Sequence, residues 1–313
     1  MKVRKQMIAL CLALAALLSA CGGGEAPEAS AETSAITFAD DLGRTVSVER
    51  PERVAVMTGS FADIWCLAGG KETLVAAAGD TWTLFDLDLG PEVVNLGGVK
   101  EIDTELLFAA QPDLVIASSN TGAGTALLDV LEAAGLPSAW FSVSSFQDYL
   151  RILEICTRLT GCPENYERYG SAVQDQVEAA RARADSSAPT VLYVRATGSS
   201  CKVKNSRDSV LGEMLADLGC VNIADSEAGL LENLSLEVIV EQDPDFIFAV
   251  VQGSDPTKAE ALLESTLLSH PAWASLTAVQ EGRFHVMDQK LYNLKPNAEW
   301  GTAYEKLADI LYP

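Results

Sequence analysis

Four basic side chains gather in one short stretch of a strongly acidic chain. The 313 residues carry a formal net charge of −22 at pH 7. The stretch RATGSSCKVKNSR nevertheless holds four of the 22 Lys and Arg residues: Arg195, Lys202, Lys204 and Arg207. Asp208 is the only acid nearby. Guanidinium and ammonium groups held together neutralise oxyanions, so the stretch predicts a pocket for an anionic ligand. A solvated basic loop is the alternative.

Two aromatic residues suggest a second contribution to such a pocket. Trp82 and Phe85 lie in the polar, glycine-flanked segment GDTWTLFD, where no core demands a large ring. They predict an aromatic wall that faces a ligand; a hydrophobic plug between two parts of the protein is the alternative. Further candidate ligand contacts lie in loops between predicted strands and helices: Thr58, Asn120, Asn233, Tyr292 and Trp300.

The sequence offers no catalytic constellation. It contains neither G-x-S-x-G nor G-x-x-x-x-G-K-[ST], the motifs of nucleophile elbows and phosphate-binding loops. Its two histidines, His270 and His285, lie in unrelated contexts, which argues against a Ser-His-Asp triad and against a His-rich site for a bare metal ion. The net charge argues against nucleic acid as a partner. We therefore expect a binding protein that is not an enzyme and has no metal or cofactor of its own.

One pattern occurs twice along the chain. The stretches DTELLFAAQPDLVIAS (103–118) and SLEVIVEQDPDFIFAV (235–250) each place a glutamate seven residues before a Pro-Asp pair and an apolar run. These glutamates are Glu105 and Glu237. A strand, a loop containing Thr-Gly-Ser, a helix and a terminal glycine also recur in the same order, from 53 and from 190. The repeat indicates two related lobes. Taken alone, each acid could simply favour the first turn of a helix.

Alternating strand and helix signals predict the architecture of each lobe. Short apolar strands spaced by helices indicate an α/β fold with a mostly parallel, covered sheet. We expect an N-terminal lobe over 36–145, which opens with a hairpin, and a C-terminal lobe over 188–313. The segment 146–187 reads as helical with a break at 161–163, and it is polar enough that we expect it to bridge two bodies. Ligands of such sheets bind beyond the carboxyl ends of the strands, here in a cleft shared by the lobes.

The N-terminus predicts export. Residues 1–20 combine a basic start, a short apolar run and small residues, as in a secretory signal peptide, and LSACG resembles a bacterial lipobox with Cys21 as the lipidated residue. Residues 21–35 are polar and of low complexity, so we expect a flexible tether. An odd number of cysteines follows, which leaves at least one thiol free and any disulfide pairing open: Cys66, Cys156, Cys162, Cys201 and Cys220.

Behind this lipobox, four stretches carry a family resemblance in their order. They are GRTVSVERPERVAVM, the two repeated stretches above, and the tail HPAWASLTAVQEGRFHVMD with LADILYP at its end. Through them the chain resembles the class III (helical-backbone, cluster A) substrate-binding lipoproteins of ABC importers, the group that captures ferric siderophores, haem and cobalamin. The resemblance covers nearly all of 36–313.

The resemblance implies a function and partners. It implies that a long, rigid bridging helix joins the lobes and that closure is small. It implies that Glu105 and Glu237 contact arginines of a permease dimer, which works with ATPase subunits. The expected cargo is a metal chelate, with a ferric siderophore first and haem or a corrinoid as alternatives. The receptor would be a monomer held on the extracytoplasmic face of the cell membrane by lipid on Cys21. A sensor or adhesin on the same fold, or an enzyme, is the rival interpretation.

Overall fold

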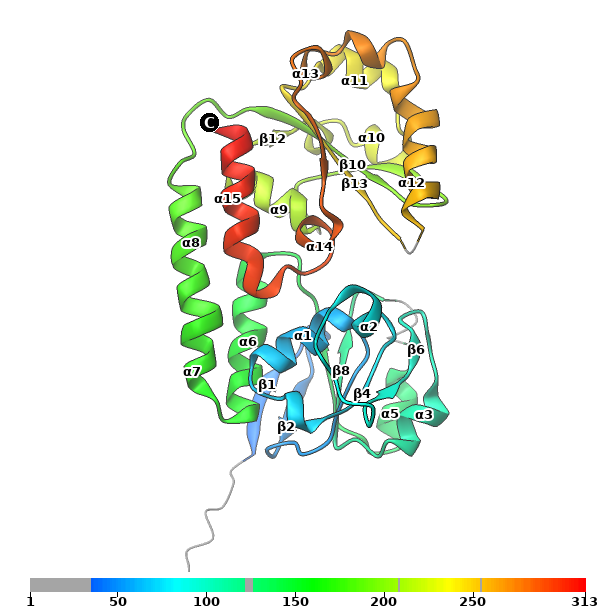
Figure 1. The fold of residues 1–313 in the computed structure, drawn as a ribbon, viewed down its shortest axis with the longest axis vertical. Coiled ribbons are helices and arrows are strands. Elements are labelled where there is room, and N and C mark those ends of the chain that lie inside the picture. The colour runs from blue at the N-terminus through cyan, green and yellow to red at the C-terminus, as the bar shows by residue number, and fades with distance from the viewer. Residues whose placement is uncertain (1–34, 122–125, 208, 254) are drawn as a thin grey trace, which may run out of the picture. The chain divides into compact units, whose positions relative to one another are not determined.

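A computed structural model describes residues 35–121, 126–207, 209–253 and 255–313 (Figure 1). The predicted signal peptide, Cys21, the tether up to residue 34 and Asp208 lie outside these described residues. All five cysteines within them carry free thiols. No helix in the described part is long and apolar enough to cross a membrane.

The N-terminal lobe is built on a parallel sheet of five strands. The predicted hairpin precedes it, with β1 (Ile36–Ala39) antiparallel to β2 (Thr45–Val48). In spatial order the strands of the sheet are β5 (Val94–Asn95), β4 (Leu74–Ala77), β3 (Val54–Val56), β8 (Leu114–Ser118) and β9 (Ser138–Phe141). Its helices are α1 (Gly59–Leu67), η1 (Lys71–Thr73), α2 (Asp80–Leu84), α3 (Thr104–Ala109) and α5 (Leu128–Ala133), and a small ladder joins β6 (Gly97–Gly98) to β7 (Glu101–Ile102).

The C-terminal lobe repeats this plan with one antiparallel edge. Its sheet has the order β11 (Cys201–Lys204), β10 (Thr190–Ala196), β13 (Phe246–Val251) and β14 (Phe284–Met287), with β12 (Val221–Asn222) beside the start of β10. Only β11 runs antiparallel to its neighbour. The helical elements are α9 (Val210–Asp217), η3 (Ile223–Asp225), α10 (Gly229–Glu232), α11 (Leu236–Gln242), α12 (Pro256–Leu263), η4 (Glu264–Leu268), η5 (Trp273–Ser275), α13 (Thr277–Gln280) and α14 (Gln289–Tyr292). The predicted α/β class and mostly parallel sheets are confirmed.

The connecting segment is a pair of helices rather than one long helix. A capping box of Ser145 and Asp148 begins α6 (Phe146–Thr160), and Gly161, with φ of 73°, ends it. The chain then turns back through α7 (Pro163–Tyr166), a π-helical stretch η2 (Glu167–Ser171) and α8 (Ala172–Arg181). Gly161 has the left-handed conformation that favours glycine at the end of a helix. The predicted break at 161–163 is therefore confirmed. Residues 163–181 are helical without interruption, and the rigid bridging helix that the resemblance implied stays a prediction.

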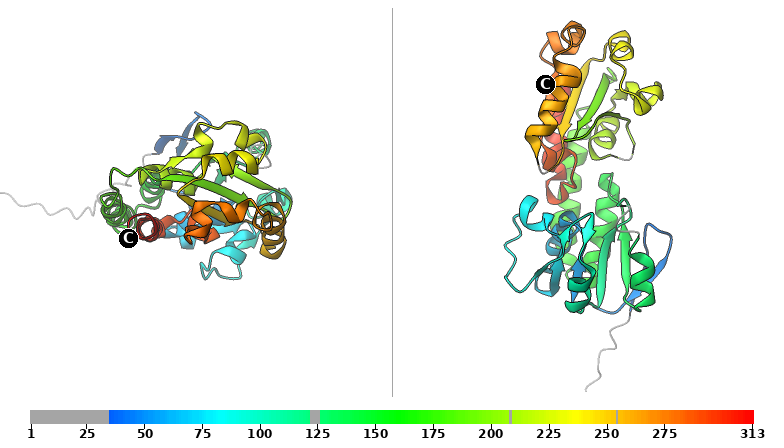
Figure 2. Two further views of the ribbon diagram at one scale, coloured as in Figure 1. Left: turned by 90° about the horizontal axis from the view of Figure 1, so that it is seen from above. Right: turned by 90° about the vertical axis from the view of Figure 1, so that its right-hand side faces the viewer.

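The second helix of the hairpin is part of the core. Val173, Val177 and Ala180 recur on one face of α8 and are buried, whereas the other faces of this polar helix are largely exposed. This face packs against α15 (Trp300–Leu311), which runs beside α8 in both figures (Figure 1, Figure 2). Three apolar residues per ten are enough for such a stripe when they follow the helical period.

One apolar cluster runs through both lobes. It contains Phe61 and Ile64 of the N-terminal lobe, Tyr149 of α6, and Tyr193 and Phe248 from one face of the C-terminal sheet. The opposite faces of the two sheets belong to separate clusters, since neighbours in a strand point to opposite faces. The hairpin α6–α8 and α15 therefore join the lobes by burial as well as by chain connection.

A buried polar contact accompanies this core. Asn297, in the turn η6 (Asn297–Glu299) before α15, is fully buried and has φ of 53°. Its Nδ2 donates hydrogen bonds to the Ser60 carbonyl oxygen at 2.9 Å and to Oδ2 of Asp63 at 2.7 Å, both in α1. Residues more than 230 positions apart in the chain are thus held together by one amide.

Asn297 offers a direct test of this contact. We expect Asn297→Ala to lower the free energy of unfolding by about 2–4 kcal/mol, because two buried hydrogen bonds are lost and alanine is strained at positive φ. Asn297→Gly loses the same bonds without the strain and should be about 1 kcal/mol less destabilising. Urea unfolding followed by circular dichroism measures both. Equal destabilisation of the two variants would show that the backbone conformation contributes nothing.

Candidate functional site

The N-terminal half of the site forms where β3 and β4 end. The Thr58 hydroxyl accepts a hydrogen bond from the Phe61 N–H at 3.4 Å and caps α1. Oδ1 of Asp80, the first residue of α2, accepts from the Gly59 N–H at 2.8 Å. A Cβ on Gly59 would lie 2.7 Å from Cδ2 of Phe85 and 2.9 Å from the Thr81 nitrogen. Glycine at this position therefore lets the beginnings of α1 and α2 approach each other.

Of the two aromatic residues predicted to face a ligand, only Trp82 is exposed. Its side chain is 39% accessible, whereas Phe85 is 4% accessible and packs against the backbone of Gly59. Burial gives Phe85 a packing role within the N-terminal lobe, because the residue it contacts, Gly59, belongs to the same lobe. Trp82 remains available to a ligand.

Tyr292 and Trp300 are core residues, which corrects their prediction as ligand contacts in loops. The Tyr292 hydroxyl donates to the Ala303 carbonyl oxygen at 3.0 Å, and the residue is buried. Trp300 is fully buried and packs against Phe146 and Tyr304, with ring centroids 5.8 and 6.1 Å apart. Both side chains anchor the C-terminal segment to α15 and α6.

Three candidate cations of the C-terminal lobe lie on the hairpin of β10 and β11. Arg195 pairs with Lys202 across the two strands, and Tyr193 pairs with Lys204. Directly paired residues point to the same face of a sheet, and so do residues two apart in one strand. Arg195, Lys202 and Lys204 therefore share one face at the carboxyl end of β10, whereas Val203 between the lysines is buried on the other. The cations were expected in one loop; three of them instead lie on a strand hairpin, and Arg207 lies beyond it, so the anion pocket stays a prediction.

Two of these cations form an unusual pair. Arg195 is half-buried and Lys202 is exposed, and neither makes an ion pair with a described residue. Like charges placed directly opposite each other destabilise a strand pair. The two cations lack an acidic partner among the described residues, although the chain has 44 Asp and Glu residues. A bound anion would remove this destabilisation.

The remaining predicted contacts lie on loops. Asn120 follows β8, and its Nδ2 donates to the Ser142 hydroxyl in the loop after β9 at 2.6 Å. Asn120 thus lies at the carboxyl edge of the N-terminal sheet, as expected. Asn233 is exposed at the end of α10, and Arg207 is exposed in the loop before α9.

Glu105 and Glu237 occupy matching local positions. Each is exposed in the first turn of a short helix, α3 or α11, directly after a capping residue and the first helical position. Oδ1 of Asp103 accepts from the Leu106 N–H at 3.0 Å, and the Ser235 hydroxyl accepts from the Val238 N–H at 3.4 Å. The repeated sequence therefore folds into the same capped turn in both lobes.

Two charged residues near the N-terminal half were missed by sequence reasoning. Burial raises the pKa of the Asp80 carboxyl, and the nearby Lys295 ammonium offsets part of this rise. Burial lowers the pKa of Lys295, and Asp80 opposes that shift. Lys295 lies in the segment DQKLYNLKPNAEW, which begins at the end of β14. Nothing in this sequence distinguishes Lys295 from the exposed Lys290.

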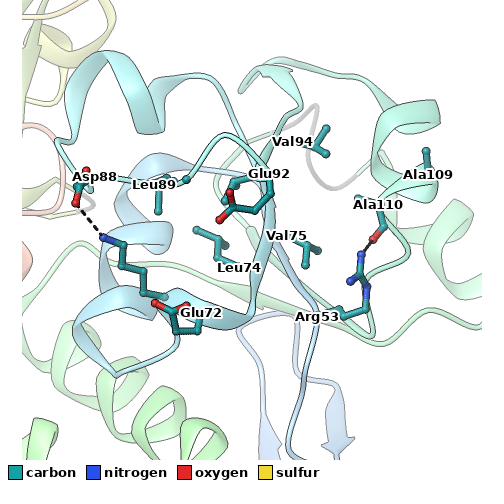
Figure 3. A pocket seen from close by; sticks show the side chains of 13 residues that line it. Arg53, Glu72, Leu74, Val75, Asp88, Leu89, Glu92, Val94, Ala109 and Ala110 are labelled. Carbon is teal, nitrogen blue, oxygen red and sulfur yellow. Dashed lines mark hydrogen bonds and ion pairs between the residues drawn. The ribbon is translucent and has the colours of Figure 1, made fainter.

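A cavity lies at the other end of the N-terminal sheet. It has a volume of about 680 Å³ and is lined by residues at or before the beginnings of β3, β4, β5 and β8 (Figure 3). Arg53 on its wall donates to the carbonyl oxygens of Ala110 and Gln111, and Lys71 pairs with Asp88 at 3.7 Å. Thr58 and Asn120 lie at the opposite, carboxyl edge, so this cavity is separate from the candidate site. A second cavity of about 540 Å³ lies between β14 and α15.

The described residues contain no group of three His, Cys, Asp or Glu side chains that could hold a metal ion.

Comparison with known proteins places this geometry in context. The family described as periplasmic binding protein matches residues 54–291. The Bacillus subtilis (strain 168) protein YhfQ, provisionally named an ABC transporter substrate-binding lipoprotein, is 20% identical over 314 residues, covering 96% of each chain.

Solved structures share the fold. The periplasmic heme-binding protein RhuT from Roseiflexus sp. RS-1, in apo form, has a TM-score of 0.67 at 24% identity and covers 83% of this chain and 98% of its own. Staphylococcus aureus SirA complexed with staphyloferrin B has a TM-score of 0.65 at 20% identity. The match covers 88% of this chain and 97% of the SirA chain.

Proposed function

Because the chain belongs to the periplasmic binding protein family, we propose that it is the receptor of an ABC importer and that its cargo is an anionic metal chelate. The chain is a binding protein and not an enzyme, so its task is capture and delivery. A ferric siderophore is the first choice of cargo, with haem or a corrinoid as alternatives. The relatives support this class, since RhuT is named for heme and SirA was solved with staphyloferrin B.

The observation that carries the proposal is the pairing of Arg195 with Lys202. Two cations opposite each other, without an acidic partner among the described residues, raise the energy of the empty hairpin. A carboxylate or catecholate oxygen would accept charge-assisted hydrogen bonds from both groups. Trp82 would add a flat apolar surface for the organic part of the chelate. Thr58, Asn120 and Asn233 are further candidate contacts at loop positions.

Delivery follows from the two matching acids. Glu105 and Glu237 project from capped turns that recur in both lobes. We propose that each engages one half of a permease dimer, so that two weak charge contacts act together and fix the orientation of the receptor. ATP hydrolysis by the partner subunits would then release the cargo inward.

The cargo site is tested by charge reversal. Wild-type protein and the variants Arg195→Glu and Lys202→Glu are titrated with ferric siderophores, haemin and cobalamin, following tryptophan fluorescence. Each reversal should weaken binding of an anionic cargo about 10- to 100-fold, because a charge-assisted hydrogen bond is lost and a repulsion gained. Arg158→Glu, on an exposed part of α6, is the matched control and should bind normally. Unchanged affinity in both site variants would place the pocket elsewhere.

Docking is tested separately from cargo binding. Glu105→Ala and Glu237→Ala should each raise the receptor concentration needed for half-maximal stimulation of the reconstituted permease–ATPase by about tenfold, since losing one contact removes the two-point attachment. Cargo affinity should stay at the wild-type value. Glu260→Ala removes an exposed acid from α12 and serves as the control. Wild-type stimulation by the double variant would exclude this docking surface.

The membrane anchor is proposed from sequence. LSACG places Cys21 where a lipobox cysteine stands, and lipid on the mature N-terminus would hold the receptor at the outer face of the cell membrane. Cys21→Ser should move the protein from the membrane fraction to the soluble fraction of fractionated cells. An unchanged distribution would mean that another feature retains it.

A further inference from the structure

Lys295 lies where the C-terminal segment meets the N-terminal lobe. It stands between α14 and η6, two positions before Asn297, whose amide is bonded to α1. The Lys295 Nζ lies 5.5 Å from the ring centroid of Phe61, and the side chain is half-buried. The residue therefore belongs to the last lobe in sequence but contacts the first turn of α1.

The ammonium group has no acceptor among the described residues. It makes no hydrogen bond with them and no ion pair within 4.0 Å, and it lies over the face of the Phe61 ring. The acid that acts on it is Asp80, whose Oδ1 already accepts the Gly59 N–H. Burial lowers the pKa of Lys295, so the charged form is held at a cost. An ammonium group carries three donors, and an aromatic face satisfies none of them fully.

Arg44 shows how another partly buried cation of the chain is accommodated. Arg44, with a side chain 25% exposed, binds Asp40 at 2.7 Å and Glu132 at 3.0 Å. Partly buried charges are normally paired in this way, because an unpaired one loses hydration without compensation. Lys295 lacks such a pair at the edge where Thr58 and Asp80 also lie.

We propose that Lys295 binds a carboxylate of the cargo, adding a cation to the N-terminal half of the site. The inference rests on the proposed function and extends it, because it makes the carboxylate a recognised feature of the chelate. The Phe61 ring below the ammonium and Asp80 beside it position the group without consuming its donors. Arg195 and Lys202 would hold the same guest from the C-terminal lobe.

Substitution at two lysines tests the assignment. Lys295→Met keeps the length of the side chain and removes the charge, and Lys295→Arg keeps the charge. Lys290→Met is the matched control, because Lys290 lies in the same segment but is exposed and paired with Glu299 at 3.8 Å.

The probes are haemin and ferric staphyloferrin B, both of which carry carboxylates. Lys295→Met should bind at least one probe about tenfold more weakly, since one charge-assisted hydrogen bond is lost. Lys295→Arg should recover most of the affinity.

A footprint on the unaltered protein provides a measurement that does not depend on a variant folding. Wild-type protein is treated briefly with acetic anhydride, with and without each probe, and acetylation of each lysine is measured by mass spectrometry. Bound cargo should slow the acetylation of Lys295 several-fold and leave that of Lys290 unchanged. Thermal unfolding of the variants shows whether any loss of affinity comes from a loss of fold.

The outcomes separate the two proposals. If wild-type protein binds a probe and depends on Arg195, but Lys295→Met binds equally well and Lys295 is not protected, the inference is overturned and the proposed function stands. If wild-type protein binds neither probe, the carboxylate assignment is overturned, whereas the proposed function is decided by the titrations with other ferric siderophores and cobalamin. Weaker binding by Lys295→Met with normal unfolding and a footprint on Lys295 supports the inference.

Discussion

Burial of one apolar cluster that runs through both lobes is the constraint on which the rest of the structure depends. Tyr149 of α6, Val177 of α8 and Tyr304 of α15 belong to the same cluster as Phe61 and Phe248 from the two lobes. Protein interiors are packed like solids and change between discrete arrangements rather than deforming continuously. A large rotation of one lobe against the other would have to break this packing and the Asn297 contact with α1. We therefore expect the proposed cargo to be recognised by side chains already in place rather than through a large closure.

The sequence predicts the elements of this fold better than the way they join. Strands such as Leu114–Ser118 are recognisable because short apolar runs between helices belong to covered parallel sheets. Gly161 is recognisable as a helix end because it follows a periodic segment and precedes Pro163. The burial of α8 is not recognisable in the same way. Its stripe of Val173, Val177 and Ala180 is thin, and its partner α15 lies more than 100 residues later.

The candidate site residues also differ in how well the sequence predicts them. Arg195 and Lys202 are predictable because they are close in sequence, and their cross-strand pairing follows from the hairpin that joins them. Trp300 is misassigned because an aromatic ring serves a core as readily as a ligand, and residue type alone does not separate the two. Lys295 is missed because its surroundings, Phe61 and Asp80, come from parts of the chain more than 200 residues away. Long-range packing decides both of these cases.

The charge distribution explains why a few cations can select a cargo. A chain with a net charge of −22 repels anions at a distance, and salt screens that repulsion beyond about 10 Å. Attraction must therefore arise at short range, where partly buried cations act in a lower dielectric than water. Arg195 and Lys295 are both half-buried, and neither is paired with an acid in the described part of the chain. Under the proposed function, cations from both lobes would act on one chelate that carries several oxygen groups, and its affinity would depend on charge at short range.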